Sequence, residues 1–292
     1  MTEVVTSQGE GLDSVGCAQV RGGNGRIDVP IELPGLRGSL HSTPSDGGSG
    51  GDVYFLSVCG SGLLTRICLA DLVGHGERVA RLSARMHALL AKLVNWPDHR
   101  RILRDLNASL VALGREALTT AAMLTYYPPT RSLTFTYAGH PPGWYYRARD
   151  RRWSRLTEDD GAGPDGVEFV NGMLGVTEEA AFTRSRLTAE PGDRLLLVTD
   201  GVLETPDPDH RLFGAGGIET LLDAIGDASP AEIARAVLDD LTGHGGGASP
   251  SHDDVTLLVL EVVPGPRGPA LWHVVRNRLL RPLRLVSDPA HV

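Results

Sequence analysis

Several features that mark specialised classes of protein are scarce in this chain. Of its 292 residues only three are cysteines, Cys17, Cys59 and Cys68, and their spacing matches no metal-binding or disulfide framework. This favours a reducing, intracellular compartment. No apolar run is long enough to span a membrane, and the first residues lack the layout of a signal peptide. We therefore expect a cytoplasmic protein.

An excess of positive charge is also missing. The chain has 28 lysines and arginines against 36 acidic residues, a formal net charge of -8, which gives no general basis for binding nucleic acid. With 41% hydrophobic and 22% charged residues the composition is that of an ordinary globular protein. The length is sufficient to bury a sizeable core.

The pattern along the chain divides it into three parts. Residues 1–49 show little periodicity beyond one candidate strand at 27–36, and we expect a flexible N-terminal arm there. Residues 50–263 carry the folded domain. Residues 264–292 interleave arginines with apolar residues, which indicates a basic amphipathic tail. Pro282 interrupts it, so docking to a membrane surface or a partner, and packing on its own domain, both stay open.

Hydrophobic periodicity predicts an antiparallel meander accompanied by helices rather than βαβ alternation. The expected strands span residues 53–59, 63–70, 119–127, 132–138, 144–148, 194–199 and 255–262. The expected helices span residues 77–94, 98–113, 217–225 and 230–242.

Aspartates recur at the ends of the apolar strands, next to glycines or turns. They are Asp52, Asp71, Asp200 and the pair Asp253 and Asp254. Each alone is compatible with a simple helix cap. Asp52 and Asp71 bracket a hairpin, however, so they should be neighbours in space. Carboxylates gathered at one rim repel each other unless a cation or proton lies between them, and all-oxygen ligation favours Mg²⁺ or Mn²⁺.

Six motifs, in order, resemble the metal-dependent protein phosphatases (PPM), in their bacterial SpoIIE-like branch. The resemblance covers about residues 50–262. The motifs are Gly50-Gly51-Asp52, residues 70–76 (ADLVGHG), residues 119–125 (TTAAMLT), residues 137–142 (YAGHPP), residues 199–204 (TDGVLE) and residues 253–256 (DDVT).

This resemblance implies an α+β fold, a four-layer α/β/β/α sandwich with two central antiparallel sheets. It also implies a site for two Mn²⁺ or Mg²⁺ ions at one rim. By matching positions, Asp71 bridges both ions, the Leu72 carbonyl binds one, Asp200 and Asp253 bind the other, and Asp52 contributes. Whether Asp253 or its neighbour Asp254 points inward stays open at this stage.

The implied reaction is hydrolysis of phosphoserine or phosphothreonine by a metal-activated bridging water. The implied substrate is a protein, such as an anti-sigma-factor antagonist in a partner-switching pathway. A general acid would assist the leaving alkoxide, and His75 or His140 could serve, although each could equally be a structural loop histidine.

One departure from the family pattern leaves two alternatives open. The family often has a second acidic residue where this chain has Phe55, so a peripheral metal ligand could be missing. The alternatives are a non-catalytic binding or regulatory module that keeps the fold, and a metal phosphatase that acts on small molecules.

Overall fold

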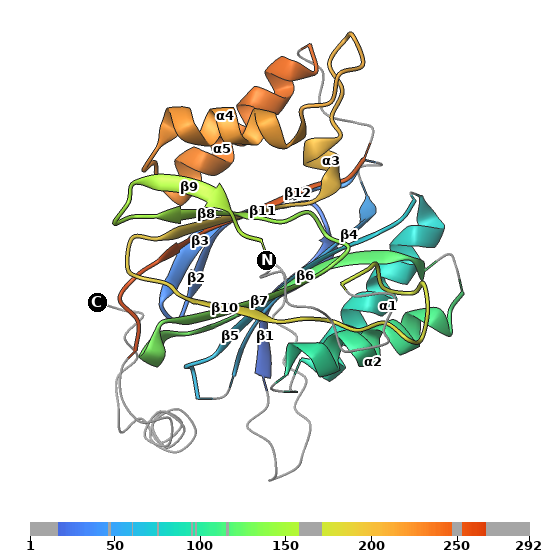
Figure 1. Cartoon of the computed structure of the whole chain (residues 1–292). Coiled ribbons are helices and arrows are strands. Elements are labelled where there is room, and N and C mark those ends of the chain that lie inside the picture. The colour runs from blue at the N-terminus through green and yellow to red at the C-terminus, as the bar shows by residue number, and fades with distance from the viewer. Residues whose placement is uncertain are drawn as a thin grey trace.

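The computed structural model describes residues 17–45, 48–59, 61–74, 76–94, 96, 98–114, 117–157, 171–246 and 253–266. These residues form four layers, in which two six-stranded antiparallel sheets pack face to face between two layers of helices (Figure 1). The predicted α/β/β/α sandwich is confirmed.

The first sheet contains most of the expected meander. Its strands, in spatial order, are β1 (Cys17–Gly25), β4 (Ser49–Cys59), β5 (Thr65–Leu72), β6 (Thr119–Tyr127), β7 (Ser132–Ala138) and β10 (Ser185–Thr188). The bounds of β6 and β7 are those predicted. β5 is shifted two residues toward the C-terminus, so that Asp71 lies within the strand, opposite Thr120.

The second sheet joins two strands from the N-terminal part of the described chain to its last strand and to three strands between residues 144 and 198. Its strands, in spatial order, are β2 (Ile27–Leu33), β3 (Leu36–Thr43), β12 (Val255–Val262), β11 (Arg194–Val198), β8 (Trp144–Arg147) and β9 (Arg152–Arg155). The pairing of β3 with β12 joins residues more than 200 positions apart in the sequence.

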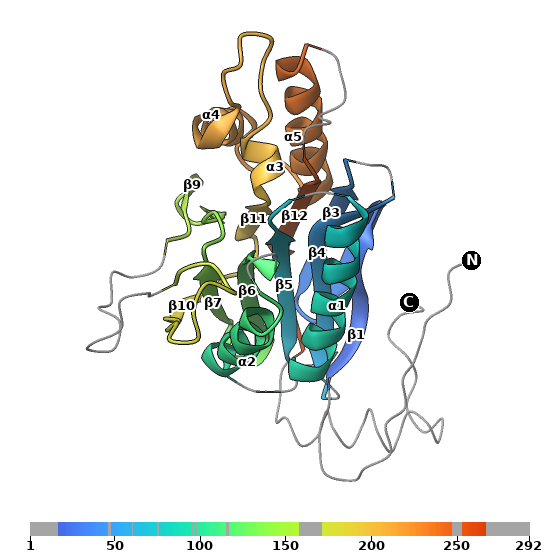
Figure 2. The same cartoon turned by 90° about the vertical axis from the view of Figure 1, so that its right-hand side faces the viewer.

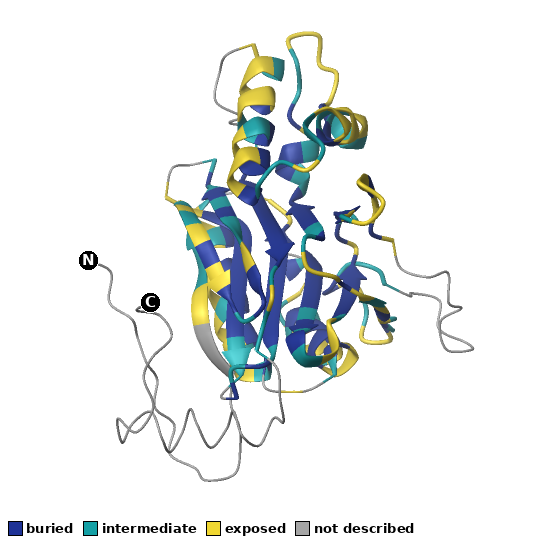
Figure 3. Cartoon of the chain, turned by 90° about the vertical axis from the view of Figure 1, so that its left-hand side faces the viewer, coloured by how far each residue is buried: buried dark blue, intermediate teal, exposed yellow. Residues whose placement is uncertain are grey.

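Helices cover the outer face of each sheet. α1 (Glu77–Leu93) and α2 (His99–Val111) pack on the first sheet, and Figure 2 shows α1 lying along β1 and β4. α4 (Gly214–Ile225) and α5 (Pro230–His244) pack on the second sheet, and the short α3 (Asp200–Leu203) follows β11. The inward faces are apolar, as for Met86, Leu90, Leu103 and Leu106, and the outward faces are exposed (Figure 3).

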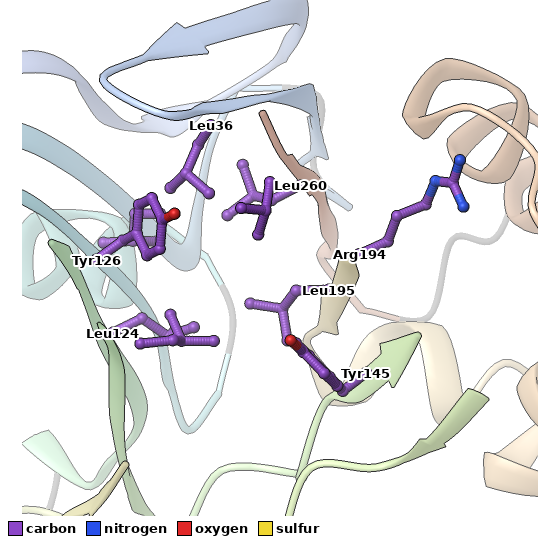
Figure 4. Close-up of a pocket in the computed structure, with 10 residues that line it drawn as sticks. Leu36, Leu124, Tyr126, Tyr145, Arg194, Leu195 and Leu260 are labelled. Carbon is purple, nitrogen blue, oxygen red and sulfur yellow. The ribbon is translucent and has the colours of Figure 1, made fainter. Parts of the chain in front are cut away.

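The space between the sheets is almost completely filled. Alternating residues of both sheets, such as Leu56, Leu124, Leu197 and Leu258, interdigitate there. A residual cavity of about 10 Å³ lies among apolar side chains, with the guanidinium of Arg194 pointing away from it (Figure 4). It is about the size of one water molecule, so this cavity is too small to hold a ligand.

The N-terminal part of the chain differs from the expected flexible arm. Residues 17–43 form β1, β2 and β3, which pair with β4 and β12 and bury Ile31, Leu33, Leu36 and Leu40. Residues 1–16 lie outside the described residues, as does the predicted tail from residue 267 onward. In the part of the chain that the structure describes, no helix is long and apolar enough to cross a membrane.

Candidate functional site

The predicted acidic residues come together at one rim of the sandwich. Asp52 in β4 is the residue before Val53, which lies opposite Ala70, so it neighbours Asp71 at the end of β5. On the other sheet, β11 leads directly into Asp200, the first residue of α3, and Asp253 and Asp254 precede β12. Since β11 and β12 are paired neighbours, all of these positions lie at adjoining strand ends.

Asp254 holds the two sheets together at this rim. One carboxylate oxygen accepts hydrogen bonds from the backbone and hydroxyl of Ser45, at 2.7 and 3.0 Å, and the other accepts the amides of Gly51 and Asp52. A carboxylate offers about four acceptor positions, so this buried one is saturated. A Cβ at Gly50 would collide with the same carboxylate, which explains the glycine.

Two threonines that the motifs contain, but to which the sequence assigned no role, position Asp52. The Thr199 hydroxyl donates to Asp52 Oδ2 at 2.8 Å and accepts the amide of Thr256 at 3.0 Å. The remaining oxygen, Oδ1 of Asp52, is buried and has no hydrogen-bond partner among the described residues. The only feature of the sequence that pointed to this role is that both threonines lie within one or two residues of a strand-end aspartate.

Burial and mutual repulsion make these carboxylates resist ionisation. Burial, with the charges of Asp200, Asp253 and Asp254, raises the pKa of Asp71 to about 8. Burial and the charge of Asp71 raise the pKa of Asp52, and burial and Glu204 raise that of Asp200. Asp71 and Asp200 are close enough to share a hydrogen bond. The rim is therefore an electrostatically unfavourable cluster that a cation would relieve.

The donor set suits a hard divalent cation. Asp71, Asp200 and Asp253 supply carboxylates, Asp52 has its unpaired buried oxygen, and a Cβ at Gly51 would come within 2.9 Å of the carbonyl oxygen of Leu72. That glycine keeps the carbonyl accessible. Within the described ranges, no three acidic, histidine or cysteine side chains already stand in ligand geometry, so ion binding requires side-chain adjustment. The chemistry of the donors nevertheless fits Mg²⁺ or Mn²⁺.

Of the two histidines predicted as candidate general acids, the structure describes only one. His75 lies outside the described residues. His140 follows Gly139, which bridges to Ala121, so it lies at the same end of the sheet as Asp71. Burial lowers the pKa of His140 to about 4, and its Nδ1 lies 2.9 Å from the carbonyl of Pro141. The ring is therefore neutral near pH 7, which suits a structural role better than proton donation.

The departure at Phe55 removes no carboxylate from the rim. Phe55 lies on β4 three residues from Asp52, so the two side chains point to opposite faces of the sheet. Its ring packs in the cluster beneath α1, with its centroid 5.5 Å from that of His87. An acidic side chain here would point toward the helices.

Comparisons with known proteins identify the family of this chain. The model of the family described as Stage II sporulation protein E (SpoIIE) matches residues 62–263. Phosphoserine phosphatase RsbU of Bacillus subtilis (strain 168) is 24% identical over 196 residues, which are 66% of this chain and 54% of RsbU. This chain thus spans about half the length of that relative.

Solved structures share the fold. The RsbU and RsbW domains of Rv1364c from Mycobacterium tuberculosis superpose with a TM-score of 0.63 at 21% identity, over 83% of this chain and 64% of that one. RsbX in complex with magnesium superposes with a TM-score of 0.57 at 17% identity, over 81% of this chain and 100% of that one. At such identities these structures support the fold alone.

Proposed function

This chain belongs to the SpoIIE family, the bacterial branch of the metal-dependent protein phosphatases, and we propose that it hydrolyses phosphoserine or phosphothreonine in a protein substrate. The observation that carries the proposal is the crowding of Asp52, Asp71, Asp200 and Asp253 at one rim, where the pKa of Asp71 is raised to about 8. Crowding of this kind costs stability in a domain that binds no cation. It therefore argues against a purely structural module.

We assign five groups to the binding of two Mn²⁺ or Mg²⁺ ions: the carboxylates of Asp71, Asp200 and Asp253, the Leu72 carbonyl, and a contribution from Asp52. When bound, such ions activate water toward phosphorus and neutralise the phosphoryl oxygens. Because four hydrogen bonds already saturate the Asp254 carboxylate, we assign its neighbour Asp253 as the ligand.

The surrounding residues fix the ligands in place. Asp254 joins the Gly50-Gly51 turn to the start of β12, and Thr199 holds Asp52 by a hydrogen bond from its hydroxyl. Rigid support of this kind is what keeps metal ligands in a productive arrangement. His140 is neutral, so we assign it to the structure of the loop rather than to proton donation.

The class of protein substrate is proposed from the similarity to characterised proteins. RsbU is named a phosphoserine phosphatase, and the Rv1364c structure contains an RsbU domain together with an RsbW domain. We therefore assign a phosphorylated anti-sigma-factor antagonist, in a partner-switching pathway, as the substrate class.

Hydrolysis of p-nitrophenyl phosphate and of a phosphoserine peptide, with Mn²⁺, Mg²⁺ or EDTA, tests the activity. We expect turnover only with a divalent ion, and loss by at least about a hundredfold in Asp71→Asn and Asp200→Asn, because each removes a charge that holds the ions. Asp223→Asn, on the exposed face of α4, is the matched control and should keep wild-type activity.

The outcomes separate the alternatives. Preference for the peptide favours a protein substrate, whereas turnover of small phosphate esters alone would favour a small-molecule phosphatase. A folded wild-type protein that neither turns over substrate nor binds Mn²⁺ by calorimetry would contradict the enzymatic proposal and support the binding module.

A further inference from the structure

A row of polar residues crosses the helix-covered face of the first sheet, far from the acidic rim. Strand pairing places its members directly opposite one another on neighbouring strands. They are Ser57, Arg66, Thr125, Thr134 and Arg186. Opposite residues of antiparallel strands share a face, and the neighbours Phe55, Cys68 and Met123 pack beneath α1 and α2.

This row ends in a cavity of about 150 Å³ beside the first residue of α2. Polar residues from four elements line it: His99 of α2, Thr125 of β6, Ser132 and Thr134 of β7, and Arg186 of β10, together with Arg184 just before β10. Arg66 and Asp71 lie five residues apart on β5, about 17 Å along the strand, with side chains on opposite faces. The cavity is therefore separate from the candidate metal site.

Positive charge gathers around this cavity. Arg66 is only 4% exposed, and its charge, with that of Arg184, acts on the buried ring of His99. The N-terminus of α2 adds the positive end of a helix dipole. One acidic residue, Asp98, lies near the cavity, with its carboxylate 3.9 Å from the guanidinium of Arg184. The same carboxylate also forms an ion pair with Arg100 at 2.9 Å, so its charge is divided between two arginines.

Arg186 is the arginine best placed to meet a ligand. It is exposed, and its guanidinium makes no hydrogen bond or ion pair within the described part of the chain. Across the strands it faces the hydroxyl of Thr134, next to Thr125. Arginines form two-pronged hydrogen bonds to tetrahedral oxyanions, and hydroxyls donate to the remaining oxygens.

We propose that this cavity binds a phosphoryl group, with Arg184 and Arg186 at its mouth and the Thr134 hydroxyl within, beside the Thr125 hydroxyl that is hydrogen-bonded to the His99 ring. The volume is below the roughly 300 Å³ at which pockets for whole small molecules begin, so a phosphate-sized group fits better than a metabolite. Inorganic phosphate and a phosphorylated side chain share this chemistry. The proposal does not depend on the proposed phosphatase activity.

Thermal melting and calorimetry of the full chain in EDTA, at constant ionic strength, test the site. Without divalent ions the acidic rim repels phosphate, so binding reports on the cavity. We expect saturable binding of phosphate, with a rise in Tm that chloride does not give. Arg186→Ser should weaken it about tenfold or more, as the loss of a charge-assisted hydrogen bond predicts, and leave Tm in chloride unchanged.

The matched control is Arg152→Ser, which removes an exposed arginine from β9 of the other sheet and should leave phosphate binding unchanged. An equal loss of phosphate affinity in both variants, or no saturable phosphate binding by the wild type, would overturn the proposal. A phosphoserine peptide that binds more tightly than inorganic phosphate would identify a phosphorylated protein as the source. Tighter binding of inorganic phosphate would identify the free anion.

Discussion

At the scale of single residues, Asp253 and Asp254 are neighbours in sequence with different surroundings. Asp254 accepts four hydrogen bonds from Ser45, Gly51 and Asp52, whereas Asp253 accepts the backbone amide of Asp254 at 2.8 Å. Asp254→Ala should therefore lower the free energy of unfolding by about 2–4 kcal/mol, because it leaves buried backbone amides without acceptors. Urea unfolding in EDTA measures this loss.

Asp253→Ala is the companion variant. It should change the stability of the metal-free protein little and lower Mn²⁺ affinity by at least about tenfold in calorimetry. The reason is that it removes a metal ligand rather than the hydrogen-bond acceptor that joins the two sheets. If Asp254→Ala kept full stability while Asp253→Ala unfolded the protein, the two assignments would have to be exchanged.

The sequence predicted which aspartates meet, but not how they are held. Strand-end positions and the hairpin indicated that Asp52 and Asp71 would be neighbours, because both depend on local periodicity and turns. The contacts of Asp254 with Ser45 and Gly51 span about 200 residues in sequence. Contacts of such separation follow from the pairing of strands across the whole fold, which no local pattern specifies.

At the scale of elements, β3 is essential to the second sheet although it lies in a segment of weak periodicity. β3 lies between β2 and β12, and its strand carries polar Ser39, His41 and Ser42 among its buried apolar residues. Polar residues and Gly38 obscure its alternation, so composition alone indicated a flexible arm. The helices and the strands β6 and β7 were predictable because their apolar periodicity is uninterrupted.

A chain that begins at residue 50 should fail to fold. It loses β1, β2 and β3, and with them the burial of Ile31, Leu33, Leu36 and Leu40. Each such side chain contributes about 1.5–3 kcal/mol, so the total of about 6–12 kcal/mol is comparable to the whole stability of a domain. Circular dichroism melting measures the result, with a chain beginning at residue 16 as the control. A cooperative, wild-type-like transition in the shorter chain would contradict the assignment of these strands to the core.

At the scale of the whole molecule, two sets of buried groups make stability depend on pH in opposite directions. The raised pKa of Asp71, about 8 against an ordinary 3.8, means that the folded metal-free protein keeps a proton that the unfolded chain releases. Its contribution to stability is therefore lost as pH rises toward 8. The lowered pKa values of His99 and His140, about 3 and 4, have the reverse effect, but mainly below the ordinary 6.5.

Just above pH 6.5 the unfolded chain still binds protons on its histidines, which adds an opposing slope, so comparison with Asp71→Asn isolates the acidic rim. In EDTA we expect the free energy of unfolding of the wild type to fall by about 2 kcal/mol relative to that of Asp71→Asn between pH 6.5 and 8, at most 1.36 kcal/mol per pH unit for one retained proton. Urea unfolding of both proteins at several pH values measures this difference. Mn²⁺ should reverse it, because ions replace the proton and bind more tightly as pH rises. Equal slopes in the wild type and Asp71→Asn would place the retained proton elsewhere.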